Sequence, residues 1–93
     1  MATLLSARDI QAKLSQLSDW TLVGKTITFT RTFKDFVAAV DFVNQLVEPA
    51  EAAGHHPDLQ ISYNRVVVSL STHDIGGLTE KDFAMAETIS ALS

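Results

Sequence analysis

Two pairs of strand-like runs, separated by a long helix-like segment, constrain the fold of this chain more than any other feature. Residues 20–23 and 26–32 alternate in the strand manner on either side of a Gly-Lys turn, which is typical of a β-hairpin. Alternation returns in residues 59–63 and 66–70, which indicates a second hairpin. Four strands joined as two hairpins predict an antiparallel sheet.

The segment between the hairpins has a helical pattern. Residues 33–53 repeat apolar side chains at a period of about 3.6 and predict one long helix. Pro49 removes a backbone donor and crowds the preceding turn, so the last turn, residues 48–53, is expected to be kinked. Gly54 is well suited to end the helix. The two histidines that come next therefore lie at the helix end.

Shorter helices are expected at both ends of the chain. Ser6 is a suitable cap for a first helix of about three turns, and Thr79 with Asp82 begins the last helix. The apolar residues at helical spacing are Ile10, Leu14 and Leu17 near the start and Phe83, Ala86, Ile89 and Leu92 near the end. The order α-β-β-α-β-β-α predicts an α+β fold, a four-stranded antiparallel sheet with three helices packed on one face. We expect residues 1–93 to form a single domain.

The composition argues against several classes of function. Seven Lys and Arg against eleven Asp and Glu give a formal net charge of −4, and no basic cluster suits a phosphate backbone, so we expect no direct nucleic-acid partner. The chain has no cysteine, which excludes a disulfide framework and a thiolate metal site. No run approaches the ~18 apolar residues of a membrane span, and the first residues do not resemble a secretory signal. We expect a soluble, cytoplasmic protein without a membrane partner.

A small open sheet leaves two edge strands with unpaired backbone groups. Such edges pair readily with another copy of the same chain. A homo-oligomer with a continued sheet is therefore expected.

All three histidines of the chain lie within residues 51–74. His55 and His56 follow the long helix, and His73 follows a strand that the second hairpin folds back toward them, so we expect the three to share one cleft. Imidazole has an unperturbed pKa of ~6.5 and both gives and takes protons near neutral pH, as paired general acid and base chemistry requires. Glu51 lies one turn earlier, where it is placed to orient an imidazole or set its tautomer.

Other interpretations of the histidines stay open on spacing alone. An adjacent His-His pair is also common as a solvent-exposed helix cap. Three neutral imidazoles can bind zinc, although this spacing matches neither the H-E-x-x-H helix nor a Cys/His finger. A nucleophilic triad fits less well, because no serine lies on a recognisable elbow and there is no cysteine.

The segment E-x-x-x-H-H-P-D, followed by Y-N-R-V, S-T-H-D and G-G-L-T-E-K-D-F, resembles the pterin-4a-carbinolamine dehydratases, also known in animals as dimerisation cofactors of a homeodomain factor. The likeness is specific, because several separated elements occur in order and at the family's spacing. The matching residues are Glu51, His55, His56, Pro57, Tyr63, His73 and Asp82. Weaker likeness extends upstream through Trp20 and the F-K-D-F at residues 33–36, so it covers most of the chain.

The resemblance implies a dehydratase that converts 4a-hydroxytetrahydropterin to quinonoid dihydropterin, in recycling of a tetrahydrobiopterin-type cofactor after aromatic amino-acid hydroxylation. It implies no metal and no organic cofactor, and a homodimer or homotetramer built through the sheet. The implied catalytic residues are His55, His56, His73 and Glu51, with no assignment of which histidine is acid and which is base. The implied substrate-binding residues are Gly54, His55, His56, Ser71, Thr72, His73 and Asp74.

The alternative function is a non-catalytic interaction or assembly module on the same fold. The presence of all three histidines together with Glu51 argues against it, because a pure scaffold has no chemical need for them.

Two positions of the matched motif have structural explanations. Asp82, three residues after Thr79, is expected to cap the last helix rather than to catalyse, and Tyr63 is expected to pack within the hairpin rather than to support a ring. Some family members have an aromatic residue where Leu59 stands and a polar residue where Gly54 stands. Gly54 makes the pocket margin more flexible, which affects substrate positioning rather than the reaction.

Overall fold

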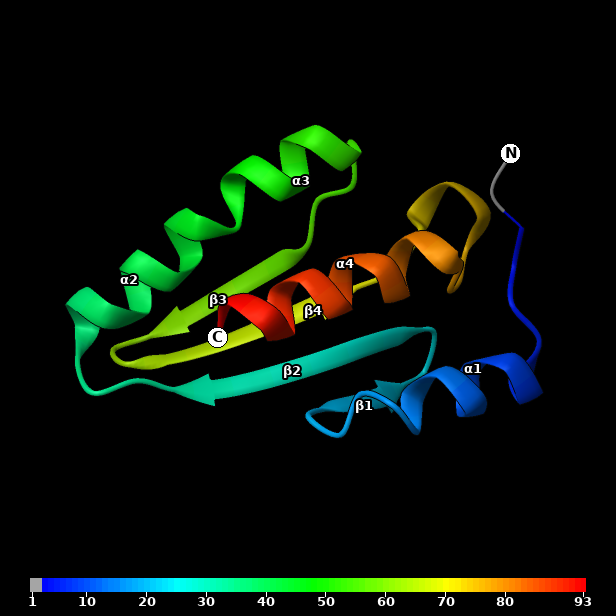
Figure 1. The fold of residues 1–93 in the computed structure, drawn as a ribbon, viewed down its shortest axis with the longest axis horizontal. Helices are drawn as coiled ribbons and strands as arrows, with labels where there is room; N and C mark the ends of the chain where they lie inside the picture. The colour runs from blue at the N-terminus through cyan, green and yellow to red at the C-terminus, as the bar shows by residue number, and fades with distance from the viewer. Residues whose placement is uncertain (1–2) are drawn as a thin grey trace.

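The computed structural model describes residues 3–93 and shows an α+β fold (Figure 1). In chain order the elements are α1 (Ala7–Leu14), β1 (Trp20–Val23), β2 (Thr26–Thr32), α2 (Phe36–Gln45), α3 (Val47–Ala53), β3 (Asp58–Ser62), β4 (Arg65–Leu70), the short 3-10 helix η1 (His73–Ile75) and α4 (Glu80–Leu92). The four strands form one antiparallel sheet in the order β1-β2-β4-β3. The predicted fold class is confirmed. Within the described residues, no helix has the length and apolar character needed to cross a membrane.

The core lies between one face of the sheet and the helices. Ile27 and Phe29 of β2 pair with Leu70 and Val68 of β4, and all four side chains are buried. Thr28, between the two β2 residues, points to the opposite, more accessible face, because side chains alternate along a strand. The helix residues that join this core are Ala39, Phe42, Leu46, Phe83, Met85, Ala86 and Ile89. The packing of the helices on one face of the sheet is as predicted.

The long helix expected over residues 33–53 is two helices that meet at Leu46. The break lies before Pro49 and not in the turn after residue 48, where the sequence placed a kink. Pro49 has no N–H to donate to the carbonyl of Gln45, so the helical hydrogen bonds are interrupted a full turn earlier. Pro49 is also the third residue of α3, where an N–H would lack an intrahelical partner in any case.

Polar side chains cap three of the helices. Ser6, Asp35 and Thr79 each accept a hydrogen bond from a backbone N–H two or three residues later, at 3.1, 2.8 and 3.2 Å. The Asp35 cap makes α2 begin at Phe36 rather than at residue 33. The first helix has eight residues, about two turns instead of three, and Leu17 packs on the core from beyond its end.

The turn between β3 and β4 contains Tyr63, which the sequence analysis placed in the hairpin packing. Tyr63 has φ +54° and is 66% exposed, so it neither packs in the hairpin nor borders the histidines. Ser62 pairs with Arg65, which leaves a two-residue turn whose first position takes the left-handed conformation. The second turn residue, Asn64, accepts a hydrogen bond from the Phe33 N–H at 2.7 Å. The prediction for Tyr63 was wrong because the turn geometry determines this position.

Candidate active site

One cavity of about 210 Å³ lies where α3, β4, η1 and α4 meet. It is lined by Gly54, His55, His56, Ser71, Thr72, His73, Asp74 and Lys81. The structure thus brings together all seven residues that the sequence analysis expected to contact substrate. It adds Lys81, which the sequence analysis did not single out, and it places Glu51 behind one of the histidines rather than in the cavity wall.

Local backbone geometry turns both walls toward this cavity. Gly54 adopts φ +61° and ends α3, so the two histidines that follow leave the helix axis. On the other wall, the N–H of Thr72 donates to the carbonyl of Gly77 at 2.9 Å and closes the loop that contains η1. Residues of this loop and of the end of α3 line the same cavity, and in Figure 1 the loop lies to the right of the end of α3. The cavity therefore depends on two loop closures that are far apart in the sequence.

His55 is held by a buried carboxylate. Its Nε2 lies 2.6 Å from Oδ1 of Asp82, and the two side chains are 11% and 0% exposed. The other oxygen of Asp82 accepts hydrogen bonds from the Thr72 hydroxyl at 2.8 Å and from the Thr79 N–H at 2.9 Å. The contact fixes the orientation of the His55 ring and leaves Nδ1 as the nitrogen without this partner.

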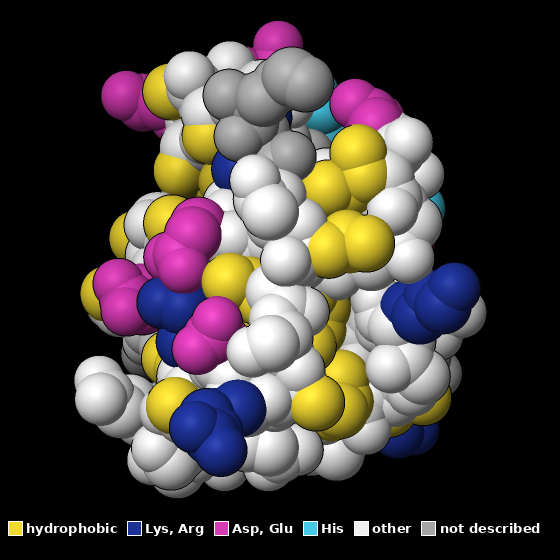
Figure 2. Space-filling model, turned by 90° about the vertical axis from the view of Figure 1, so that its right-hand side faces the viewer, with side chains coloured by type: hydrophobic (Ala, Val, Ile, Leu, Met, Phe, Trp, Pro, Cys, Tyr) yellow, Lys and Arg dark blue, Asp and Glu magenta, His cyan; other side chains and the backbone are white. Residues whose placement is uncertain are grey.

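The two other histidines have carboxylate partners near the surface. Nε2 of His56 lies 2.6 Å from Oε2 of Glu51, and Nε2 of His73 lies 3.7 Å from Oδ2 of Asp58. All four side chains are more than 60% exposed. Figure 2 shows a histidine side chain (cyan) near the top of the view, next to an acidic side chain (magenta). Each of the three imidazoles therefore has a carboxylate partner of its own.

Asp82 combines the expected role with an unexpected one. The predicted helix cap is confirmed, since Asp82 and Thr79 form a reciprocal capping box at the start of α4. The contact with His55 was missed, because it joins residues 27 positions apart and no local pattern reports it. The match of Asp82 to the family motif was the one signal that marked it for more than capping.

Metal binding was the other chemical interpretation of the histidines. Among residues 3–93, no group of three or more His, Cys, Asp or Glu side chains is arranged to hold a metal ion. The imidazoles pair one by one with carboxylates instead of converging their nitrogens on a common point.

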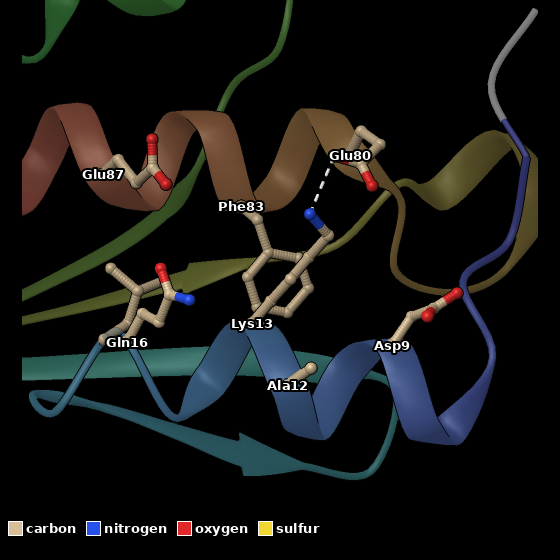
Figure 3. A pocket seen from close by; sticks show the side chains of 8 residues that line it. Asp9, Ala12, Lys13, Gln16, Glu80, Phe83 and Glu87 are labelled. Atoms are coloured by element: carbon tan, nitrogen blue, oxygen red, sulfur yellow. Dashed lines mark ion pairs between the residues drawn. The ribbon is translucent and has the colours of Figure 1, made fainter.

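A second cavity, of about 400 Å³, lies between α1 and α4 (Figure 3). It is lined by Asp9, Ala12, Lys13, Gln16, Leu17, Glu80, Phe83 and Glu87. Nζ of Lys13 and Oε2 of Glu80 form an ion pair of 3.0 Å across it. Its lining has no histidine and none of the residues that the sequence predicts for the site.

Comparison with known proteins agrees with this geometry. A family model described as Pterin 4 alpha carbinolamine dehydratase matches residues 3–92. The chain belongs to this family. The resemblance seen in the sequence is confirmed over nearly the whole chain.

Relatives of the pterin-4a-carbinolamine dehydratase family are similar at full length. A relative from a Cyanothece species is 62% identical over the whole chain and 96% of its own length, and one from a Nostoc species is 61% identical over the whole of both chains. Both carry the pterin-4-alpha-carbinolamine dehydratase name.

Solved structures show the same fold. The crystal structure of a transcriptional coactivator/pterin dehydratase from Brucella melitensis matches with a TM-score of 0.93 and 37% identity, over 97% of this chain and 98% of that one. A pterin dehydratase-like protein described as a RuBisCO assembly factor in the alpha-carboxysome matches with a TM-score of 0.67 and 23% identity, over 80% of this chain and 88% of that one. The second likeness shows a shared fold alone.

Proposed function

We propose that this chain dehydrates 4a-hydroxytetrahydropterin to quinonoid dihydropterin by histidine general acid and base catalysis, without a metal or an organic cofactor. The observation that carries the proposal is that all three imidazoles line one cavity, each with its own carboxylate. Membership of the dehydratase family supports it. The reaction belongs in the recycling of a tetrahydrobiopterin-type cofactor.

The chemistry needs two proton transfers and no nucleophile. The bond between C4a and the hydroxyl oxygen breaks, and an acid protonates the oxygen as it leaves as water. A base removes the proton from N5, and the electron pair of that N–H bond forms the double bond between N5 and C4a. Imidazole performs both steps near neutral pH, and two positioned imidazoles share them.

The burial of the three histidines suggests how they divide the work. His56 and His73 are well exposed, so they exchange protons with solvent between turnovers. His55 is fixed by Asp82 in the wall, so it orients the ring of the substrate. Glu51 orients His56 through the 2.6 Å contact. We assign the acid and base roles to His56 and His73 jointly.

Association of copies through the sheet is part of the proposal. β3 lies at one edge of the sheet, and all five of its residues are exposed. Leu59 and Ile61 are 37% and 41% exposed, which is unusually open for apolar residues on the strand face that packs toward the helices. Pairing of β3 with another copy buries these side chains and satisfies its free backbone groups. Sedimentation at micromolar concentration tests this, and a monomer alone would contradict it.

The catalytic proposal is tested by following loss of the 4a-carbinolamine in a coupled hydroxylase assay. Wild-type protein is expected to accelerate the loss, and His56→Ala and His73→Ala are each expected to reduce turnover by at least about 100-fold. Gln16→Ala, on the far cavity between α1 and α4, is the control and should retain full turnover. Unchanged turnover in both histidine variants would refute the mechanism. An inert wild-type protein would favour the alternative, an assembly module without catalysis.

A further inference from the structure

Lys81 is the single Lys or Arg among the eight residues that line the histidine cavity. It lies in the first turn of α4, next to Asp82, and its side chain is exposed whereas that of Asp82 is buried. Lys81 and His55 also line a smaller hollow beside the cavity, so the two side chains share one wall. A cationic donor therefore borders the cavity close to a candidate orienting histidine.

The contacts within the described part of the folded chain give the Lys81 side chain no stabilising role. Among residues 3–93, no carboxylate lies within 4 Å of the Lys81 ammonium, whereas Lys13 has Glu80 at 3.0 Å. The first turn of a helix is the positive end of its dipole, where a cation is unfavourable. Lys81 is the second residue of α4 and meets this unfavourable field. A role toward a ligand accounts for it better.

The other residues of the cavity wall show which hydrogen-bonding partner a bound pterin would still need. A cavity of about 210 Å³ is small for a ligand site and suits a flat bicyclic ring whose substituents lie outside. The pyrimidinone edge of a pterin carries two donors, the 2-amino group and N3–H, and one acceptor, the 4-oxo oxygen. Asp74 supplies a carboxylate to the cavity wall, which is an acceptor suited to these donors, and the Thr72 hydroxyl already donates to Asp82. The 4-oxo oxygen needs a donor, and Lys81 is the one residue of the wall whose side chain is a donor only.

We propose that Lys81 donates a hydrogen bond to the 4-oxo oxygen of the bound pterin and so orients the ring for reaction. The inference rests on the proposed dehydratase function and adds a substrate-binding residue to it. The 4-oxo oxygen and N5 lie on the same side of the pterin ring system, so holding the oxygen places the N5–C4a bond toward the histidines. Lys81 recognises the oxo form of the ring, and a ring with a 4-amino group in its place offers it no acceptor.

The test compares two ligands on four proteins. The dissociation constants of 7,8-dihydropterin and of 2,4-diamino-7,8-dihydropteridine are measured by calorimetry for wild type, Lys81→Met, Lys81→Arg and the control Lys25→Met, which changes a turn between β1 and β2. Lys81→Met is expected to weaken binding of the oxo ligand by about tenfold or more, the usual effect of losing a charged hydrogen bond, and to leave the diamino ligand unchanged. Lys81→Arg should retain most of the affinity, and Lys25→Met all of it.

Two further readouts separate binding from folding. Lys81→Met should raise KM more than it lowers kcat, and its thermal midpoint should be equal to or above that of wild type, because a cation leaves the first turn of α4. The role of Lys81 would be overturned if Lys81→Met weakened binding of both ligands equally or did not weaken binding of the oxo ligand. In either case, turnover by the wild-type protein would leave the proposed dehydratase function standing. A wild-type protein that neither binds the oxo ligand nor turns over would overturn both.

Discussion

Two histidine–carboxylate pairs in this protein have the same length and opposite surroundings. His55 and Asp82 are 2.6 Å apart inside the protein, and His56 and Glu51 are 2.6 Å apart at its surface. Removing one member of a buried pair leaves a desolvated polar group, whereas water replaces a lost partner at the surface. The distance between the two groups of a pair therefore does not by itself indicate how much the pair contributes to the stability of the protein. The first pair is buried in the wall of the cavity, and the second is in contact with solvent.

Replacing Asp82 should have the largest effect. Asp82→Ala removes the partner of the His55 ring, the Thr72 hydroxyl and the Thr79 N–H at once, and is expected to lower the free energy of unfolding by about 3–5 kcal/mol. Asp9→Ala is the matched control, because Asp9 is likewise the third residue of its helix but is exposed, and should cost less than about 1 kcal/mol. Urea denaturation measures both, and equal losses would remove the distinction between a buried and an exposed carboxylate at this helix position.

The two histidines of the pairs should separate stability from activity. His55→Ala leaves Asp82 buried without its imidazole and is expected to cost about 2–4 kcal/mol, whereas His56→Ala should cost less than about 0.5 kcal/mol. Both variants should lose turnover. Denaturation measures the stability of both variants, and the coupled assay on the same samples measures their turnover. The prediction is wrong if His56→Ala is less stable than His55→Ala.

The hydroxyl that supports the buried pair should have an intermediate effect. Thr72→Val keeps the shape of the side chain and removes its donation to Asp82, with an expected loss of about 1–2 kcal/mol. Thr30→Val, on the exposed side of β2, should lie within about 0.5 kcal/mol of wild type. Thermal unfolding compares them, and a neutral Thr72→Val would show that the network around Asp82 is not needed to hold it.

The surface pair should give the smallest change in stability. Glu51→Gln is expected to change the free energy of unfolding by less than about 0.5 kcal/mol, because exposed ion pairs are weak and screened by salt. Its turnover should fall by less than tenfold, and raised salt should narrow the gap to wild type. A stability loss as large as that of His55→Ala would contradict the comparison.

Much of the fold was readable from local patterns. The strand pairs, the cap at Thr79 and the glycine that ends α3 each depend on residues within a few positions of one another. The prediction failed at two residues whose local pattern is compatible with two structures. Pro49 was expected to kink one helix but separates two helices, and Tyr63 was expected to pack within the hairpin but lies in its turn. Both errors arise where backbone hydrogen bonding outweighs side-chain pattern.

The amino-acid order by itself determined which residues make up the candidate site. These are three histidines with a glutamate behind one of them and two short polar loops, and both the residue chemistry and the family motif mark them. Only the tertiary structure decided which carboxylate each imidazole contacts, that Asp82 is buried beneath His55, and that Lys81 borders the same cavity. The physical reason is distance along the chain. Hydrophobic periodicity and helix caps act over a few residues, whereas these contacts join segments that meet only after the sheet and helices have packed.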